Sequence, residues 1–138
     1  RAVMFINEEN GLRGGEEYAR EAAEKTIKHV AAMESDRGGF APRGFTVLAD
    51  SMIVSKISKW APLFATISAD RIGPGGGGAD ISPLARQRVP AISLVPELHR
   101  YFDYHHSDND TIDKVNEREL EVGAAAMAIM AYLISEEF

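Results

Sequence analysis

Three clusters of polar side chains in this sequence have residue types that could carry out chemistry. They are Glu8-Glu9, Glu34-Ser35-Asp36, and the run His105-His106-Ser107-Asp108-Asn109-Asp110. Carboxylates and imidazoles together form the ligand set of a hard-to-borderline divalent cation such as Zn²⁺, which needs no thiolate. The sequence contains no cysteine. Any metal site would therefore be built from these oxygen and nitrogen donors.

The adjacent acids Glu8 and Glu9 follow the apolar run AVMFI and precede a glycine-rich turn. Successive side chains on a strand point to opposite faces, and at a strand end neighbours can diverge around a single site. One carboxylate could then bind a metal ion while the other faces a reacting water. A hydrolase needs both groups, because the metal acidifies the water and a base accepts its proton.

Each cluster also has a plainer interpretation. A Glu-Glu pair before a turn is usually a solvated strand end, and Asp36 before two glycines is typical of an ordinary turn. The paired histidines are less usual on a plain surface. The run GPGGGG (73–78) could cradle a phosphate, but it lacks the lysine and the serine or threonine of a P-loop.

Strands and helices must alternate along the chain to position these clusters. Apolar runs predict strands, and helical spacing with capping residues predicts helices between them. Strands are expected at 2–6, 27–33, 45–48 and 89–95, helices at 16–26, 51–64, 81–86 and 117–136, and loops at 37–44, 73–78 and 100–114. This order predicts an α/β domain in which helices pack on a sheet. The first two clusters then lie at the carboxyl ends of strands, where open α/β sheets bind ligands.

The composition and charge of the chain limit the kinds of molecule that it is expected to bind. The 138 residues are 45% hydrophobic and 26% charged, with a net charge of −6, as expected for one globular domain. The negative charge argues against a nucleic-acid surface and gives no reason to expect binding to anionic membranes. No apolar run approaches the roughly 18 residues that a membrane span needs.

Four segments, taken together and in this order, resemble the co-catalytic zinc exopeptidases, in particular the carboxypeptidase Q-like branch of this aminopeptidase family. They are NEENGLRGGEEYA, HVAAMESDRGGFAPRGF, GPGGGGADISPL and VPAISLVPELHRYFDYHHSDNDTIDKV. The resemblance covers nearly the whole chain. It implies a three-layer α/β fold, whose mixed and mostly parallel sheet carries helices on both faces. It further implies two zinc ions, a peptide substrate, hydrolysis of terminal peptide bonds, and a secreted or periplasmic location.

The resemblance also implies roles for single residues. The family pattern maps the general base to Glu8 and zinc ligands to Glu9, Asp36 and His106, the last of which opens the motif HSDNDT. Glu34 lies two residues before Asp36 and could be confused with it. Asp80, in GGADISPL, matches an aspartate near the family site and is expected to support the ligands indirectly. Residues 40–45 and 73–78 are candidates for contact with substrate.

The chain departs from the family pattern in length. Only about half of the usual catalytic domain is present, and residues 1–138 match its carboxyl-terminal part. A zinc-binding histidine and a bridging aspartate precede the Glu-Glu pair in the family, so this chain retains one ligand of the first zinc site and two of the second. We therefore expect weak or absent zinc binding and no activity from this chain alone.

The missing strands are also expected to leave exposed sheet edges, which favour pairing with the missing half or with a second copy. Two other functions stay open at this point. One is a noncatalytic half-domain that self-associates as a binding or assembly unit. The other is a phosphate-binding protein that uses residues 73–78.

Overall fold

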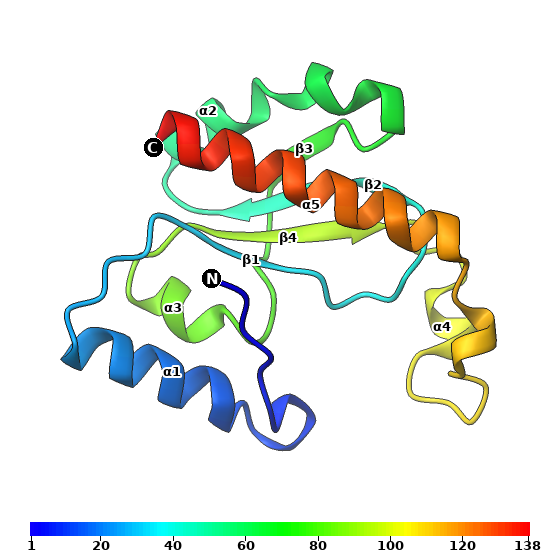
Figure 1. The fold of residues 1–138 in the computed structure, drawn as a ribbon, viewed down its shortest axis with the longest axis horizontal. Helices are drawn as coiled ribbons and strands as arrows, with labels where there is room; N and C mark the ends of the chain where they lie inside the picture. Colours follow the sequence, from blue (N-terminus) through cyan, green and yellow to red (C-terminus); the bar gives the residue numbers. More distant parts are fainter.

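A four-stranded mixed sheet forms the centre of the molecule in the computed structural model, which describes all residues, 1–138 (Figure 1). The strands are β1 (Ala32–Glu34), β2 (Pro42–Leu48), β3 (Arg71–Pro74) and β4 (Ala91–Pro96). Their order in the sheet is β1-β4-β2-β3. The β1–β4 and β2–β3 pairs are parallel, whereas β2 and β4 are antiparallel. The predicted mixed and mostly parallel sheet is confirmed.

Helices cover both faces of this sheet (Figure 1). They are α1 (Arg13–Glu24), α2 (Ser51–Ser58), α3 (Ser82–Arg86), α4 (Tyr101–Tyr104) and α5 (Glu117–Glu137), with 3₁₀ turns η1 (Glu8–Asn10), η2 (Ala61–Ile67) and η3 (Ile112–Lys114). None of them is both long and apolar enough to cross a membrane.

Two apolar clusters hold the three layers together. On one face of the sheet, side chains of β2 and β4 such as Phe45 and Ile92 pack with Met130 of α5. On the other face, Ala32 and Ala91 pack with residues of α1 and α3. Burying these side chains removes apolar surface from water, which is the main favourable contribution to folding. The three-layer architecture is therefore confirmed.

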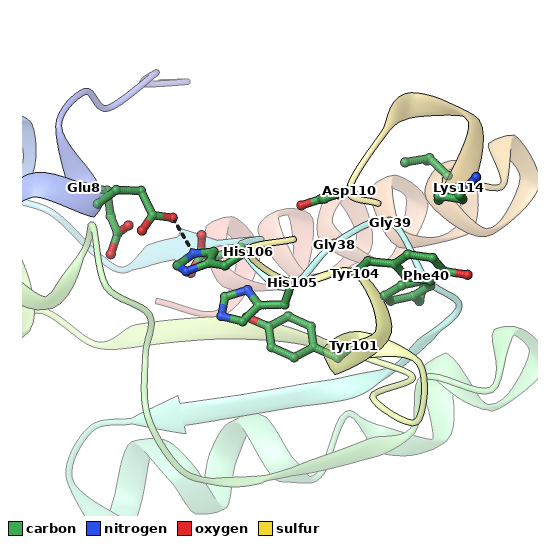
Figure 2. A pocket seen from close by; sticks show the side chains of 13 residues that line it. Glu8, Gly38, Gly39, Phe40, Tyr101, Tyr104, His105, His106, Asp110 and Lys114 are labelled. Carbon is green, nitrogen blue, oxygen red and sulfur yellow. Dashed lines mark hydrogen bonds and ion pairs between the residues drawn. The ribbon is translucent and has the colours of Figure 1, made fainter. Parts of the chain in front are cut away.

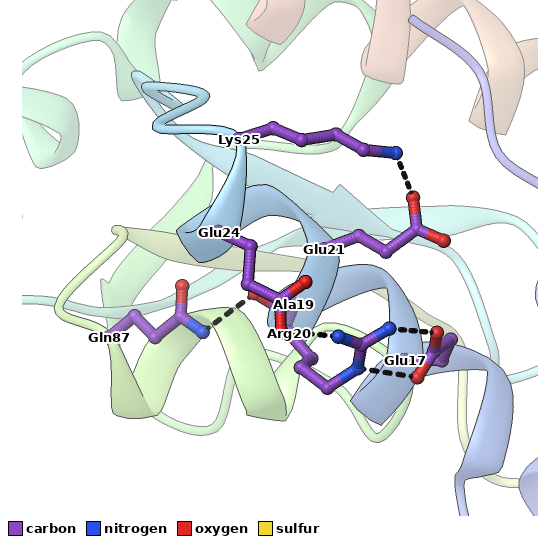
Figure 3. A network of polar contacts seen from close by, with 7 residues as sticks. All are labelled: Glu17, Ala19, Arg20, Glu21, Glu24, Lys25 and Gln87. Atoms are coloured by element: carbon purple, nitrogen blue, oxygen red, sulfur yellow. Dashed lines mark hydrogen bonds and ion pairs between the residues drawn. The ribbon is translucent and has the colours of Figure 1, made fainter.

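The inner side of helix α1 packs into the second apolar cluster through Ala19, and its outer side faces solvent. Its outer side carries ion pairs of Arg20 with Glu17 and Glu24, spaced three and four residues apart (Figure 3). Such exposed pairs contribute little to stability, because solvent screens the charges. Gln87, just after α3, donates a 2.9 Å hydrogen bond to the carbonyl of Ala19. This bond connects the two helices of the layer.

The predicted strand at 2–6 is wrong. These residues form no strand, because no neighbouring strand pairs with them. Several of their apolar side chains are exposed, including Met4 at 92% and Ile6 at 73%. Strand β1 is also shorter than predicted and begins at Ala32. It lies at one edge of the sheet, paired only with β4.

The expected loops contain regular structure. Strand β2 begins inside the predicted turn at 37–44, and β3 extends into the predicted glycine loop at 73–78. Gly44 explains the second difference, since its φ of +151° suits glycine and a Cβ there would clash with the backbone of Arg71 in β3. The glycine allows β2 and β3 to pair closely at this point.

Candidate functional site

A cavity of about 290 Å³ lies beyond the carboxyl ends of β1 and β4 (Figure 2). All four predicted site residues line it: Glu8, Glu9, Asp36 and His106. The rest of its wall comes from residues 38–40, which follow β1, and from residues within 101–115, which follow β4. The structure therefore brings together side chains from three separate parts of the sequence.

The sheet explains how two of these parts meet. Asp36 lies two residues after β1, and His106 follows α4, ten residues after β4 ends. Because β1 and β4 are parallel neighbours, their carboxyl ends face the same side of the sheet. Glu8 and Glu9 do not follow a strand of the sheet but lie on the 3₁₀ turn η1. The left-handed backbone of Asn7 and Leu12, with φ of 66° and 58°, shapes this turn.

Glu9 and His106 are in direct contact, although 97 positions separate them in the sequence. His106 Nε2 lies 3.0 Å from Glu9 Oε1. Two ligand atoms on one tetrahedral zinc ion, each about 2.0–2.2 Å from it, lie roughly 3.3 Å apart. At 3.0 Å the two side chains are hydrogen-bonded to each other, and a small separation of the same two atoms would let them share a cation. Both side chains are well exposed, at 65% and 59%.

The ligand set in this chain is nevertheless incomplete. No group of three or more His, Asp or Glu side chains is arranged to hold a metal ion. Asp36 lines the same cavity but does not complete such a group with Glu9 and His106. A catalytic zinc usually has three protein ligands. The residues present fit part of a zinc site.

Glu34 and Asp36, which the sequence could not separate, have different surroundings. The two carboxylate oxygens of Glu34 accept hydrogen bonds from the backbone nitrogens of Ala79 and Ile81, each at 3.0 Å. The Asp36 carboxylate is exposed and makes no side-chain hydrogen bond within the chain. The geometry thus favours Asp36 over Glu34 as the group that could bind a cation.

Glu34 also explains Gly78, the last glycine of the tract at 73–78. A Cβ on Gly78, whose φ is +110°, would lie 2.5 Å from Glu34 Oε2. The end of the tract therefore packs against a carboxylate, a group that repels phosphate. This contact disfavours the phosphate-binding hypothesis.

The pKa of Glu8 is raised above the ordinary value of a glutamate. Desolvation raises the pKa of Glu8 most, the negative charges of Glu9, Asp36 and Asp80 raise it further, and His106 lowers it. A carboxyl group with a raised pKa is better matched to proton transfer near neutral pH than an ordinary glutamate.

Asp80 lies beside this group. Desolvation and then the charge of Asp36 raise the pKa of Asp80. Its Oδ1 atom is buried without a hydrogen-bond partner. A buried acceptor of this kind is costly to leave unpaired.

Aromatic side chains that were not predicted as site residues form one wall of the cavity. Phe40 stacks on Tyr104 with ring centroids 6.0 Å apart, and the guanidinium of Arg100 lies 4.9 Å from the Phe40 ring centre. Tyr101 and His105 line the cavity as well. The signal was present in the spacing of Tyr101 and His105, four residues apart, which places both on one face of a helical turn.

The comparisons with known proteins agree with this geometry. The family model described as Peptidase family M28 matches residues 1–131. The chain belongs to peptidase family M28. This assignment confirms the family resemblance seen in the sequence.

Relatives of this M28 chain include two mammalian proteins named carboxypeptidase Q. The one from Bos taurus is 28% identical over 136 residues, which are 99% of this chain and 29% of that protein. The one from Homo sapiens is 27% identical over the same shares. A solved structure, of a Peptidase M28 precursor from Shewanella amazonensis SB2B, is 31% identical with a TM-score of 0.84, and covers 96% of this chain and 30% of that one. The M28 chain thus spans less than a third of the length of these relatives.

Proposed function

We propose that this M28 chain is the carboxyl-terminal part of the catalytic domain of a metallo-exopeptidase that hydrolyses terminal peptide bonds at a two-zinc site. The observation that carries the proposal is the contact between Glu9 and His106 in a cavity that Glu8 and Asp36 also line. Family membership supports a peptidase, and the carboxylate and imidazole donors support zinc. A secreted or periplasmic location stays a prediction from the family resemblance.

Each side chain has a role in this proposal. Glu9, Asp36 and His106 would hold zinc, which when bound polarises the scissile carbonyl and lowers the pKa of water. Glu8 accepts a proton from the attacking water on its carboxylate and passes it to the leaving amine. Its raised pKa suits both transfers, because the carboxyl group must take up the proton and then release it.

The remaining ligands are proposed to lie in residues of the longer protein that this sequence does not contain. The chain alone is then inactive and binds zinc weakly. Glu9 and His106 supply only two ligands to one zinc ion, and Asp36 supplies only one to the other. Exposed ligands that are not part of a complete set give low affinity.

A zinc titration followed by calorimetry tests the ligand roles in the longer protein. His106→Ala should lower zinc affinity strongly, whereas His99→Ala should not. His99 is a matched control because its side chain is similarly exposed, at 64%, and does not line the cavity. Glu8→Gln should strongly slow the hydrolysis of dipeptides without loss of zinc. The proposal fails if hydrolysis or zinc uptake is unaffected by both His106→Ala and Glu8→Gln.

The open edge of β1 favours a second function for the isolated chain, which is self-association. An apolar groove of about 700 Å³ runs along this edge, lined by Tyr18 of α1, by Met127 of α5 and by Val30, which precedes β1. Val30 is 53% exposed. The backbone groups on the free side of an edge strand are unpaired and can accept another strand. We propose that the missing part of the longer protein covers this groove, and that a second copy covers it when that part is absent.

Sedimentation of the 138-residue chain tests this pairing. Val30→Lys should shift a dimer toward monomer, and Met52→Lys should not, since Met52 is 79% exposed on α2, away from the groove. A chain that is monomeric at all concentrations would exclude self-association, while leaving the peptidase proposal to the zinc titration.

A further inference from the structure

The rings of Tyr101, His105 and His106 form a stacked column in the wall of the cavity (Figure 2). The centroid of the His105 ring lies 4.5 Å from that of Tyr101 and 3.9 Å from that of His106, at interplanar angles of 24° and 28°. Rings that are close to parallel at these separations attract one another. The middle ring therefore connects a helix residue to the histidine that contacts Glu9.

The backbone builds this column in two steps. The His105 amide donates a 2.9 Å hydrogen bond to the Tyr101 carbonyl, so the two side chains lie on one face of a helical turn. The chain then reverses at His106, which has a φ of 54° in the left-handed region. Consecutive residues of a continuing helix do not face each other. The reversal is what brings the His106 ring over that of His105.

His106 has little else to orient it. Its side chain is 59% exposed, and its one hydrogen-bond partner, Glu9, is 65% exposed. A side chain in such surroundings samples several rotamers, and ordering it when a ligand binds costs conformational entropy. A stacked neighbour that restricts the ring beforehand lowers that cost.

We propose that His105 is a positioning residue that holds the imidazole of His106 with Nε2 toward Glu9, and that it acts through its ring face and not through a nitrogen atom. The purpose of this positioning, to present Glu9 and His106 to a cation, rests on the proposed function. The stacking itself does not. An aromatic ring without nitrogen should therefore replace His105, whereas it could not replace a metal ligand or a hydrogen-bonding group.

The test compares His105→Leu with His105→Phe in the 138-residue chain, with zinc chloride alone as the probe. NMR of the His106 ring without zinc reports the stack, and a zinc titration of the same signals gives the Kd at that residue. We expect His105→Leu to move the His106 ring resonances toward those of an unstacked histidine and to weaken zinc binding about 3- to 10-fold, the size of one aromatic pair. His105→Phe should restore both measurements to near wild type.

Two results would overturn the proposal. If His105→Phe behaves like His105→Leu, the nitrogen atoms matter and His105 acts as a ligand or hydrogen-bonding group. If His105→Leu leaves the zinc-free resonances of His106 unchanged, His105 does not position that ring. A different result, unchanged zinc affinity in His106→Ala, would refute the proposed ligand role instead.

A folding control keeps the comparison valid. Amide resonances outside residues 98–115 should be the same in every variant. If His105→Leu does not fold, Tyr101→Leu against Tyr101→Phe makes the same comparison at the other end of the column. Tyr101→Phe should match wild type, because it keeps the ring that stacks on His105.

Discussion

Two neighbouring glycines of the tract GPGGGG should respond in opposite ways to the same substitution. At Gly78 the backbone φ is +110°, and an added Cβ would lie 2.5 Å from Oε2 and 2.8 Å from Oε1 of Glu34. At Gly76 an added Cβ would meet nothing within 4 Å, and the backbone is not in the left-handed region. Gly76→Ala is therefore a matched control for Gly78→Ala.

The change in the free energy of unfolding depends on the hydrogen bonds that Glu34 loses when its carboxylate moves. Its carboxylate is the end of a flexible side chain, so it can move away from a new methyl group. It is half-buried, however, and accepts hydrogen bonds from the Ala79 and Ile81 amides at 3.0 Å each. Hydrogen bonds to a charged group contribute about 1.5–3 kcal/mol each. An alanine at positive φ adds roughly 1–2 kcal/mol of strain.

Losing one hydrogen bond and adding that strain should lower the free energy of unfolding by about 2.5–5 kcal/mol in Gly78→Ala. Gly76→Ala should leave this free energy unchanged or raise it by up to about 1 kcal/mol, because alanine restricts the unfolded chain.

Urea unfolding followed by circular dichroism measures this difference. The midpoint should fall in Gly78→Ala with the m value unchanged, since the surface exposed on unfolding is the same. Amide hydrogen exchange should also become faster at Ala79 and Ile81. If the two glycine variants unfold within about 0.5 kcal/mol of each other, Glu34 does not hold this loop, and the assignment of Asp36 over Glu34 as a cation ligand loses its support.

Three further outcomes can be checked on single side chains. In the longer protein, Glu8→Gln should lower kcat/KM by about 10²–10⁴, the usual contribution of a general base, with zinc affinity unchanged in calorimetry. The hydrogen bond from Arg43 holds the pKa of Glu97 at about 2. Because this pKa is depressed, the resulting stability is present above the unfolded pKa of roughly 4.3 and is lost as pH falls toward 2. The Tm difference between wild type and Arg43→Gln should therefore shrink over that range. Met130→Ala should cost about 2–5 kcal/mol in urea unfolding, because Met130 is fully buried, whereas Met52→Ala at a 79% exposed position should cost almost nothing.

Local signals in the sequence predicted the helices and strands whose ends are determined by residues within or next to them. Helix α5 begins after Asn116, whose side chain accepts a hydrogen bond from the amide of Glu119, and its start at residue 117 was read from the sequence. Strand β4 is an apolar run, buried at most positions, and its prediction was off by one or two residues. These elements are decided by capping and by continuous hydrophobicity, which are visible within a short window.

Elements that depend on a distant partner were not predictable in this way. Residues 2–6 have the composition of a strand, but a strand exists only where another strand pairs with it. Strand β3 reads RIGP, whose glycine and proline are typical of a loop, and it forms because Gly44 lets β2 come close. The family pattern supplied the positions of Glu8 and Asp36. It could not show that the oxygens of Glu34 are occupied by amides more than forty residues further along the chain.

The open edge of the sheet and the incomplete ligand set lie at the same place in the molecule. The apolar groove is lined by residues 29–33, which lead into and form β1, and Asp36 of the cavity follows two residues after that strand ends. Any segment that extends the sheet beyond β1 therefore ends or begins beside Glu8, Glu9 and Asp36. Donors carried on such a segment would come from beyond β1, whereas His106 follows β4 on the other side of that strand. If both proposals hold, covering the groove and completing the zinc site are one structural event. By linkage, zinc should then strengthen the association between this chain and the part that covers it.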